Sequence, residues 1–149
     1  SVASRGLGDV YKRQMLRKIT DANLEKRILF LGKKPFEDLP KLFQGMSVVA
    51  ALSRNEGYGL TPLEGMASGA AVLTSSEGVW DELVRDGIDG YVVKTNDVFQ
   101  TSERLNTLIE NSSKTKIMGE NAAKYISENF SVEKEAEQII QHIRYVQNI

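Results

Sequence analysis

The chain of 149 residues contains 19 basic and 20 acidic side chains, for a formal net charge of -1 at pH 7. Because the two signs are interleaved, the sequence lacks the basic patch of a nucleic-acid-binding protein, and we expect no nucleic-acid partner. With no cysteine and one histidine, the chain cannot form disulfides or thiolate nucleophiles, and we expect no metal site.

The first 14 residues, SVASRGLGDVYKRQ, show neither helical nor strand periodicity. We interpret residues 1–14 as a disordered or non-native leader and residues 15–149 as one compact domain. No apolar run approaches the ~20 residues that span a bilayer, and the N-terminus lacks the apolar core of a signal peptide. We therefore expect a cytoplasmic protein.

From Met15 onward, predicted helices alternate with predicted strands. A helix ends near residue 24, and the apolar run RILFLG predicts a strand over 28–31. A helix over 37–44 follows, and a short helix in VWDELVRDG is expected to end at Gly87. Continuous apolar strands separated by helices indicate an α/β fold, a Rossmann-like parallel sheet with flanking helices. The further strands are predicted over 48–52, 71–74 and 90–93.

The last third of the chain, from residue 96, carries three predicted amphipathic helices. Ser131 is expected to cap the last one. His142 is expected to be a surface side chain, because no second metal ligand or partnered nucleophile accompanies it. The three apolar faces consist of Val98, Leu105, Leu108 and Ile109; of Ile117, Met118, Tyr125 and Ile126; and of Val132, Ala136, Ile139, Ile140 and Ile143.

Residues 53–69, SRNEGYGLTPLEGMASG, have two interpretations. In a structural one, Thr61 caps a helix, Pro62 is its first residue and Glu64 returns to the cap amide as in a capping box. That interpretation leaves Glu56 and the glycines after it unexplained. A loop that joins a parallel strand to a helix N-terminus places free amides where α/β sheets bind phosphates. Since carboxylates accept hydrogen bonds from hydroxyls, the pattern predicts a nucleotide sugar as ligand.

Residues 53–75, SRNEGYGLTPLEGMASGAAVLTS, resemble the donor-site signature of retaining glycosyltransferases of the GT-B fold, the large family 4 or group 1. The segments RILFLGKKPFEDLPKLFQGMSVVAALS and GVWDELVRDGIDGYVV resemble the neighbouring elements of that family, so the resemblance covers about residues 15–147. It implies that the chain is part of the C-terminal, donor-binding domain.

The resemblance also implies roles for single residues. Glu64 would hold the ribose hydroxyls, Glu56 would be the catalytic residue that contacts the transferred sugar, and Gly32 and Lys33 would border the base. The sugar of a nucleoside diphosphate donor would be transferred with retention, as in polysaccharide biosynthesis, with no cofactor. The turn amides that bind the sugar and the distal phosphate would be those of Gly57, Tyr58, Gly59, Leu60 and Thr61.

Other expectations concern the whole enzyme. The acceptor, a glycan, lipid or other small molecule, would bind mainly through an N-terminal domain, and the full-length enzyme could associate peripherally with a membrane. The phosphate-binding arginine and lysine of the family have no counterpart in residues 1–14, so we expect the isolated chain to be inactive. The alternatives are a nucleotide-sugar-binding fragment without activity and a nucleotide-sugar 2-epimerase of the same fold. Gly65 replaces the family's usual alanine, which costs up to about 1 kcal/mol of helix propensity.

The strand order of doubly wound domains predicts that strands 48–52, 71–74 and 90–93 form one contiguous parallel group. Unpaired buried backbone groups cost about 1 to 3 kcal/mol each, so we expect residues 28–31 to pair directly with 48–52. We also expect exposed apolar surface on this chain.

Overall fold

The structure is a computed structural model that describes residues 2–54 and 59–147, with side chains from residue 10. It forms two units, residues 1–35 and 36–149, and each is described by itself. The expected division into a leader, residues 1–14, and one domain, residues 15–149, stays a prediction.

The first unit begins with helix α1, Val2–Asp21, where we expected residues 1–14 to be disordered. Residues 12–18 are lysine, arginine, glutamine, methionine and leucine, all of which favour helix strongly. The helix therefore needs no apolar periodicity. The interpretation of residues 1–14 as a non-native leader stays a prediction.

Residues 28–31 have no regular secondary structure, so the predicted strand is wrong, and so is its pairing with residues 48–52. All four side chains are exposed, and Leu29 keeps 81% of its surface accessible. The pairing argument assumed that unpaired backbone groups of this segment would be buried. In an exposed segment water satisfies them, so that cost does not arise.

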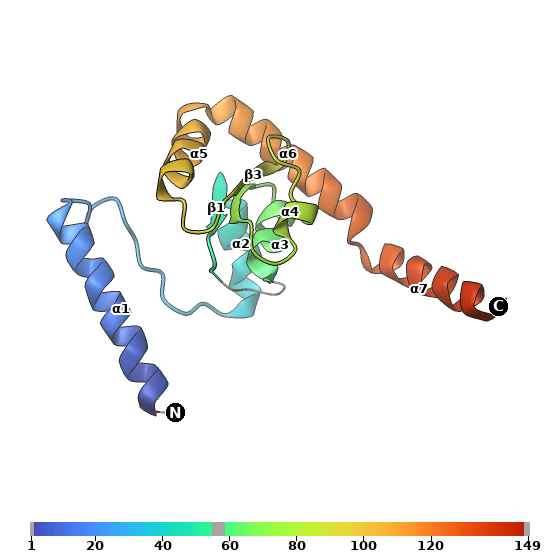
Figure 1. The fold of residues 1–149 in the computed structure, drawn as a ribbon, viewed down its shortest axis with the longest axis horizontal. Helices are drawn as coiled ribbons and strands as arrows, with labels where there is room; N and C mark the ends of the chain where they lie inside the picture. The colour runs from blue at the N-terminus through green and yellow to red at the C-terminus, as the bar shows by residue number, and fades with distance from the viewer. Residues whose placement is uncertain (1, 55–58, 148–149) are drawn as a thin grey trace. The chain divides into compact units, whose positions relative to one another are not determined.

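Three parallel strands form the sheet of the second unit (Figure 1): β1, Val48–Ala51; β2, Ala71–Ser75; and β3, Gly90–Val93. Their order is β1-β2-β3, and both pairings are parallel. Val48 lies opposite Ala71, and Ser75 lies opposite Val93. The predicted contiguous parallel group is confirmed.

Helices connect and follow the strands. Asp97 and Asn111 cap two of them, accepting hydrogen bonds from the amides of Gln100 (2.9 Å) and Lys114 (3.0 Å). The predicted cap at Ser131 is confirmed, since its hydroxyl accepts from the Lys134 amide at 3.2 Å. The helical elements are η1, Phe36–Asp38; α2, Leu39–Gln44; α3, Leu60–Ala67; α4, Trp80–Leu83; α5, Val98–Glu110; α6, Ser112–Asn129; and α7, Val132–Gln147.

Glycines with positive φ shape two of the connections. Gly69, at φ 86°, follows the last turn of α3, where glycine readily adopts this left-handed backbone conformation. Helix α4 ends at Leu83, so the predicted end at Gly87 is wrong. Gly87, at φ 77°, instead lies in the turn before β3, where its amide bonds to the Gly90 carbonyl at 2.8 Å.

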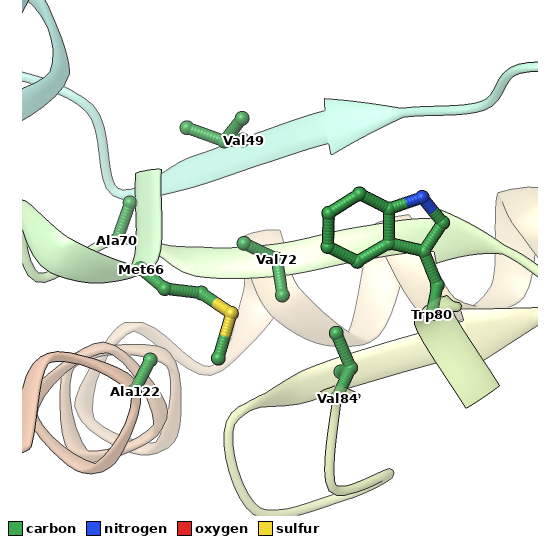
Figure 2. Close-up of a cluster of buried hydrophobic side chains, with 7 residues drawn as sticks. All are labelled: Val49, Met66, Ala70, Val72, Trp80, Val84 and Ala122. Atoms are coloured by element: carbon green, nitrogen blue, oxygen red, sulfur yellow. The ribbon is translucent and has the colours of Figure 1, made fainter. Parts of the chain in front are cut away.

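The two faces of β2 build two apolar clusters, because side chains alternate along a strand. Val72 belongs to the cluster shown in Figure 2, which also contains Val49, Met66, Ala70, Trp80, Val84 and Ala122 and joins the sheet to α3, α4 and α6. The cluster on the opposite face consists of Ala71, Leu73, Tyr91, Val93, Leu108 and Met118, with α5 and α6 as its helices.

Several predicted core positions are exposed. On α5 only Leu108 is buried, whereas Val98 and Ile109 are exposed, and on α6 Ile117 is exposed while Met118 is buried. The predicted apolar face of α7 is exposed along its length, and His142 is exposed as expected. Amphipathic spacing identifies a face that can be buried, but only a packed neighbour buries it.

Gly65 has a packing role that the sequence did not reveal. A Cβ at this position would lie 2.8 Å from Cγ2 and 2.9 Å from Cβ of Val49. Glycine therefore allows α3 to approach β1 closely. This contact explains why alanine would not simply recover helix propensity here.

Candidate functional site

The connection from β1 to α3 leaves the carboxyl edge of the sheet, where parallel α/β sheets bind ligands. Strand β1 ends at Ala51 and α3 begins at Leu60. Glu56, Gly57 and Tyr58, which the sequence assigns to this loop, lie outside the described residues. The predicted cleft with Glu56 and Glu64 therefore stays a prediction.

The N-terminus of α3 has no side-chain cap. Its N-cap residue is Gly59, with extended backbone (φ -83°, ψ 131°), and among the described residues no side chain caps the helix. The predicted capping box is wrong, because the helix begins two residues earlier than expected and Thr61 is already its second residue. Pro62 is tolerated in this turn, whose amides have no intrahelical acceptor. The remaining free amides can bind an anion.

Glu64 faces a different environment, one turn further along α3. It is half-buried and lines a cavity of about 280 Å³. Among the described residues its carboxylate has neither an ion pair nor a hydrogen bond. The structural explanation for Glu64 therefore fails, and its carboxylate is available to hydroxyl donors of a ligand.

The opposite wall of this cavity comes from η1 and α2, which the sequence did not connect with the site. Phe36, Leu39, Pro40 and Phe43 line it, together with Ala67 and Ser68 of the region around the α3 C-terminus. Phe36 is an exposed aromatic side chain. An apolar wall facing a carboxylate suits a ligand that combines an apolar ring face with hydroxyl groups.

A buried hydroxyl joins the strand ends. Ser75, the last residue of β2, is 3% exposed, and its Oγ donates to the Ser53 carbonyl at 2.6 Å. This bond fixes the first residue of the motif segment 53–69 against the central strand. The sequence analysis assigned Ser75 no role.

Gly32 and Lys33 belong to the first unit, whereas Gly59, Leu60, Thr61 and Glu64 lie together at the start of α3 in the second. Gly32 has φ 66°, a backbone conformation that favours glycine, and Lys33 is exposed. Their predicted place beside the base stays a prediction.

The described residues contain no group of three or more histidine, aspartate and glutamate side chains that could hold a metal ion. Across residues 2–54 and 59–147, no helix combines the length and apolar character needed to cross a membrane.

A family model described as "Glycosyl transferases group 1" matches residues 7–125. The chain belongs to the group 1 glycosyltransferase family. The match confirms the predicted family and begins within the segment 1–14 that we set apart.

Relatives and solved structures agree with this family. The lipopolysaccharide core biosynthesis mannosyltransferase LpcC of Rhizobium leguminosarum is 39% identical over 121 residues, which are 81% of this chain and 34% of that protein. A second such mannosyltransferase, LpsB of Rhizobium meliloti, is 29% identical, with 93% of this chain and 40% of that protein covered. The chain thus spans between about a third and two fifths of the length of these curated relatives.

Two solved structures share the fold. The C-terminal domain of the group 1 protein LpcC from Francisella tularensis has a TM-score of 0.76 and 28% identity, covering 82% of this chain and 63% of that one. Anabaena HepE, solved in complex with UDP, has a TM-score of 0.82 and 29% identity, covering 92% of this chain and 37% of that one. The predicted α/β fold of a GT-B C-terminal domain is confirmed.

Proposed function

We propose that this chain is the donor-binding part of a group 1 glycosyltransferase that takes a sugar from a nucleoside diphosphate and transfers it with retention. One observation carries the proposal. Among the described residues, no side chain caps the N-terminus of α3 or pairs with Glu64 one turn further on, and the Glu64 carboxylate lines a largely apolar cavity. Free amides suit the diphosphate, and the carboxylate with its apolar wall suits the nucleoside.

In this proposal each residue acts on one part of the donor. The amides from Gly57 to Thr61 bind the sugar and the distal phosphate, and the dipole of α3 stabilises the charge that develops on the departing diphosphate. Glu64 accepts hydrogen bonds from the ribose hydroxyls, and Glu56 contacts the hydroxyls of the transferred sugar. Gly32 and Lys33 border the base. HepE, which was solved with UDP, supports a nucleotide ligand for this part of the fold.

Charge-to-alanine variants of the full-length enzyme test these roles. Glu64→Ala should raise the donor Kd by about tenfold or more, because it removes hydrogen bonds between a charged acceptor and the ribose. Glu56→Ala should mainly lower kcat. Steady-state kinetics and nucleotide titration measure both effects. Glu103→Ala, an exposed carboxylate on α5, is the matched control and should change neither.

The stability of the Glu64 variant separates binding from folding. Since the Glu64 side chain takes no part in a helix cap, Glu64→Ala should melt within a few degrees of the parent enzyme. The opposite kinetic pattern, with a turnover defect for Glu64→Ala and a binding defect for Glu56→Ala, would contradict the assigned roles.

A second expectation concerns the chain of 149 residues by itself. We propose that it binds a nucleotide sugar but transfers no sugar, because acceptor positioning and part of the phosphate contacts belong to the remaining length of its relatives. The purified chain should release no UDP above background from common UDP-sugars in a coupled assay. Product analysis by mass spectrometry would also detect the 2-epimerase alternative. Robust glycoside formation by this chain would refute the expectation.

A further inference from the structure

A second cavity, of about 220 Å³, lies at the carboxyl ends of all three strands. Its walls include Arg54 after β1, Ser75 at the end of β2 and Lys94 after β3. The start of α5 closes it, with Asp97 and Thr101 among the lining residues. Three chain segments that are far apart in the sequence thus contribute polar groups to one hollow.

This cavity lies on the α5 side of the sheet. Ser75 shares its face of β2 with Ala71 and Leu73, which pack in the cluster that includes Leu108 of α5. Val72 points to the other face and packs with Met66 of α3. A diphosphate bound at the N-terminus of α3 would therefore leave this second cavity open.

The side chains that line the cavity have a net positive charge. Arg54 and Lys94 are exposed, and within the described residues neither side chain has a carboxylate partner. Asp97 opposes them with one negative charge. Its carboxylate already accepts the Gln100 amide at 2.9 Å and lies at the positive end of α5, so that charge is partly offset.

The available donors suit an oxyanion. A guanidinium offers five N–H donors and an ammonium three, and both form their strongest hydrogen bonds with phosphate or carboxylate oxygens. Ser75 cannot give its proton to a ligand while it donates to the Ser53 carbonyl at 2.6 Å. Its bond instead holds the segment before Arg54 in place. Arg54 and Lys94 therefore follow the two outer strands, β1 and β3. The hydrogen bond from Ser75 of the central strand, β2, holds the segment that carries Arg54.

We propose that Arg54 and Lys94 form a second anion site, which binds a phosphate or carboxylate group of the acceptor substrate. The inference rests on the proposed function, because only a transferase has an acceptor. The site shares the carboxyl edge of the sheet with the donor site but uses the opposite face, so both substrates can be bound at once.

Titration of the full chain with inorganic phosphate tests the site, with amide shifts in two-dimensional NMR spectra as readout at constant ionic strength. Phosphate should shift the amides of Lys94, Asn96 and Val98, both without and with saturating UDP. Arg54→Gln and Lys94→Gln should each weaken phosphate binding about tenfold, because each removes charge-assisted hydrogen bonds. Lys124→Gln, at an exposed lysine 3.9 Å from Glu128, is the matched control and should not weaken it. Parallel titration with malonate distinguishes a carboxylate from a phosphate ligand.

Three outcomes separate the ideas. Displacement of phosphate by UDP would assign the cavity to the donor and overturn the proposal. Unchanged phosphate binding in both glutamine variants would also overturn it. If UDP failed to shift Gly59 and Leu60 while phosphate still bound, the donor site of the proposed function would fail and the anion site would stand.

Discussion

Gly119→Ala is expected to lower the free energy of unfolding by about 3 kcal/mol or more, at the upper end of the cost of overpacking a core. A Cβ on this residue of α6 would lie 2.0 Å from the carbonyl oxygen and 2.8 Å from the carbonyl carbon of Gly69, and 3.2 Å from the Ala71 amide nitrogen. All three are backbone atoms, so no side chain can rotate away. The helix would have to move off the turn between α3 and β2, which would loosen Met118 and Ala122 in the two clusters.

Urea denaturation followed by circular dichroism measures this loss. Gly45→Ala is the matched control, because a Cβ there meets its nearest atom, the Leu42 carbonyl oxygen, at 3.4 Å and the backbone φ is -83°. It should change stability by less than about 1 kcal/mol. Equal stability of the two alanine variants would show that α6 does not pack on this turn as described.

Arg85→Met is expected to cost about 2 to 4 kcal/mol, because it leaves the Asp89 carboxylate buried without its cation. The Arg85 guanidinium forms two bonds to Asp89, from Nε to Oδ2 at 2.7 Å and from Nη2 to Oδ1 at 2.6 Å. The Asp89 side chain is fully buried, whereas that of Arg85 is 43% exposed. The hydrogen bond to Asp89 raises the pKa of Arg85 above its ordinary value, and the guanidinium also stacks 4.4 Å above the Tyr125 ring.

A double-mutant cycle separates the charge from the packing. Asp89→Asn alone should cost less than Arg85→Met, and the double variant should be more stable than the sum of the two losses predicts. Lys124→Met supplies the control, since its 3.9 Å pair with Glu128 is exposed and worth at most about 1 kcal/mol. If the losses in the free energy of unfolding of the two single variants simply added up in the double variant, the Arg85–Asp89 interaction would contribute no stability of its own.

The sequence alone predicted the three parallel strands, their order and the helices between and after them. Each of β1, β2 and β3 lies in a largely apolar stretch of the sequence, and such a stretch indicates a strand when both its faces become buried. The same pattern misled us at residues 28–31, which are equally apolar but lie in no strand. Apolar composition expresses a tendency to be buried, whereas a strand also needs a neighbour that supplies hydrogen bonds.

The candidate site also has features that the sequence predicted and features that only the tertiary structure decided. Local spacing was enough to identify the segment 53–69 and the glycosyltransferase family, because the residue types and intervals of that motif are properties of the chain itself. The start of α3 at Leu60, the approach of Gly65 to Val49 and the wall that Phe36 and Phe43 place opposite Glu64 were decided by the tertiary structure. Each depends on atoms from segments separated in sequence, and no local pattern specifies how closely two backbones approach or which side chains meet across a cavity.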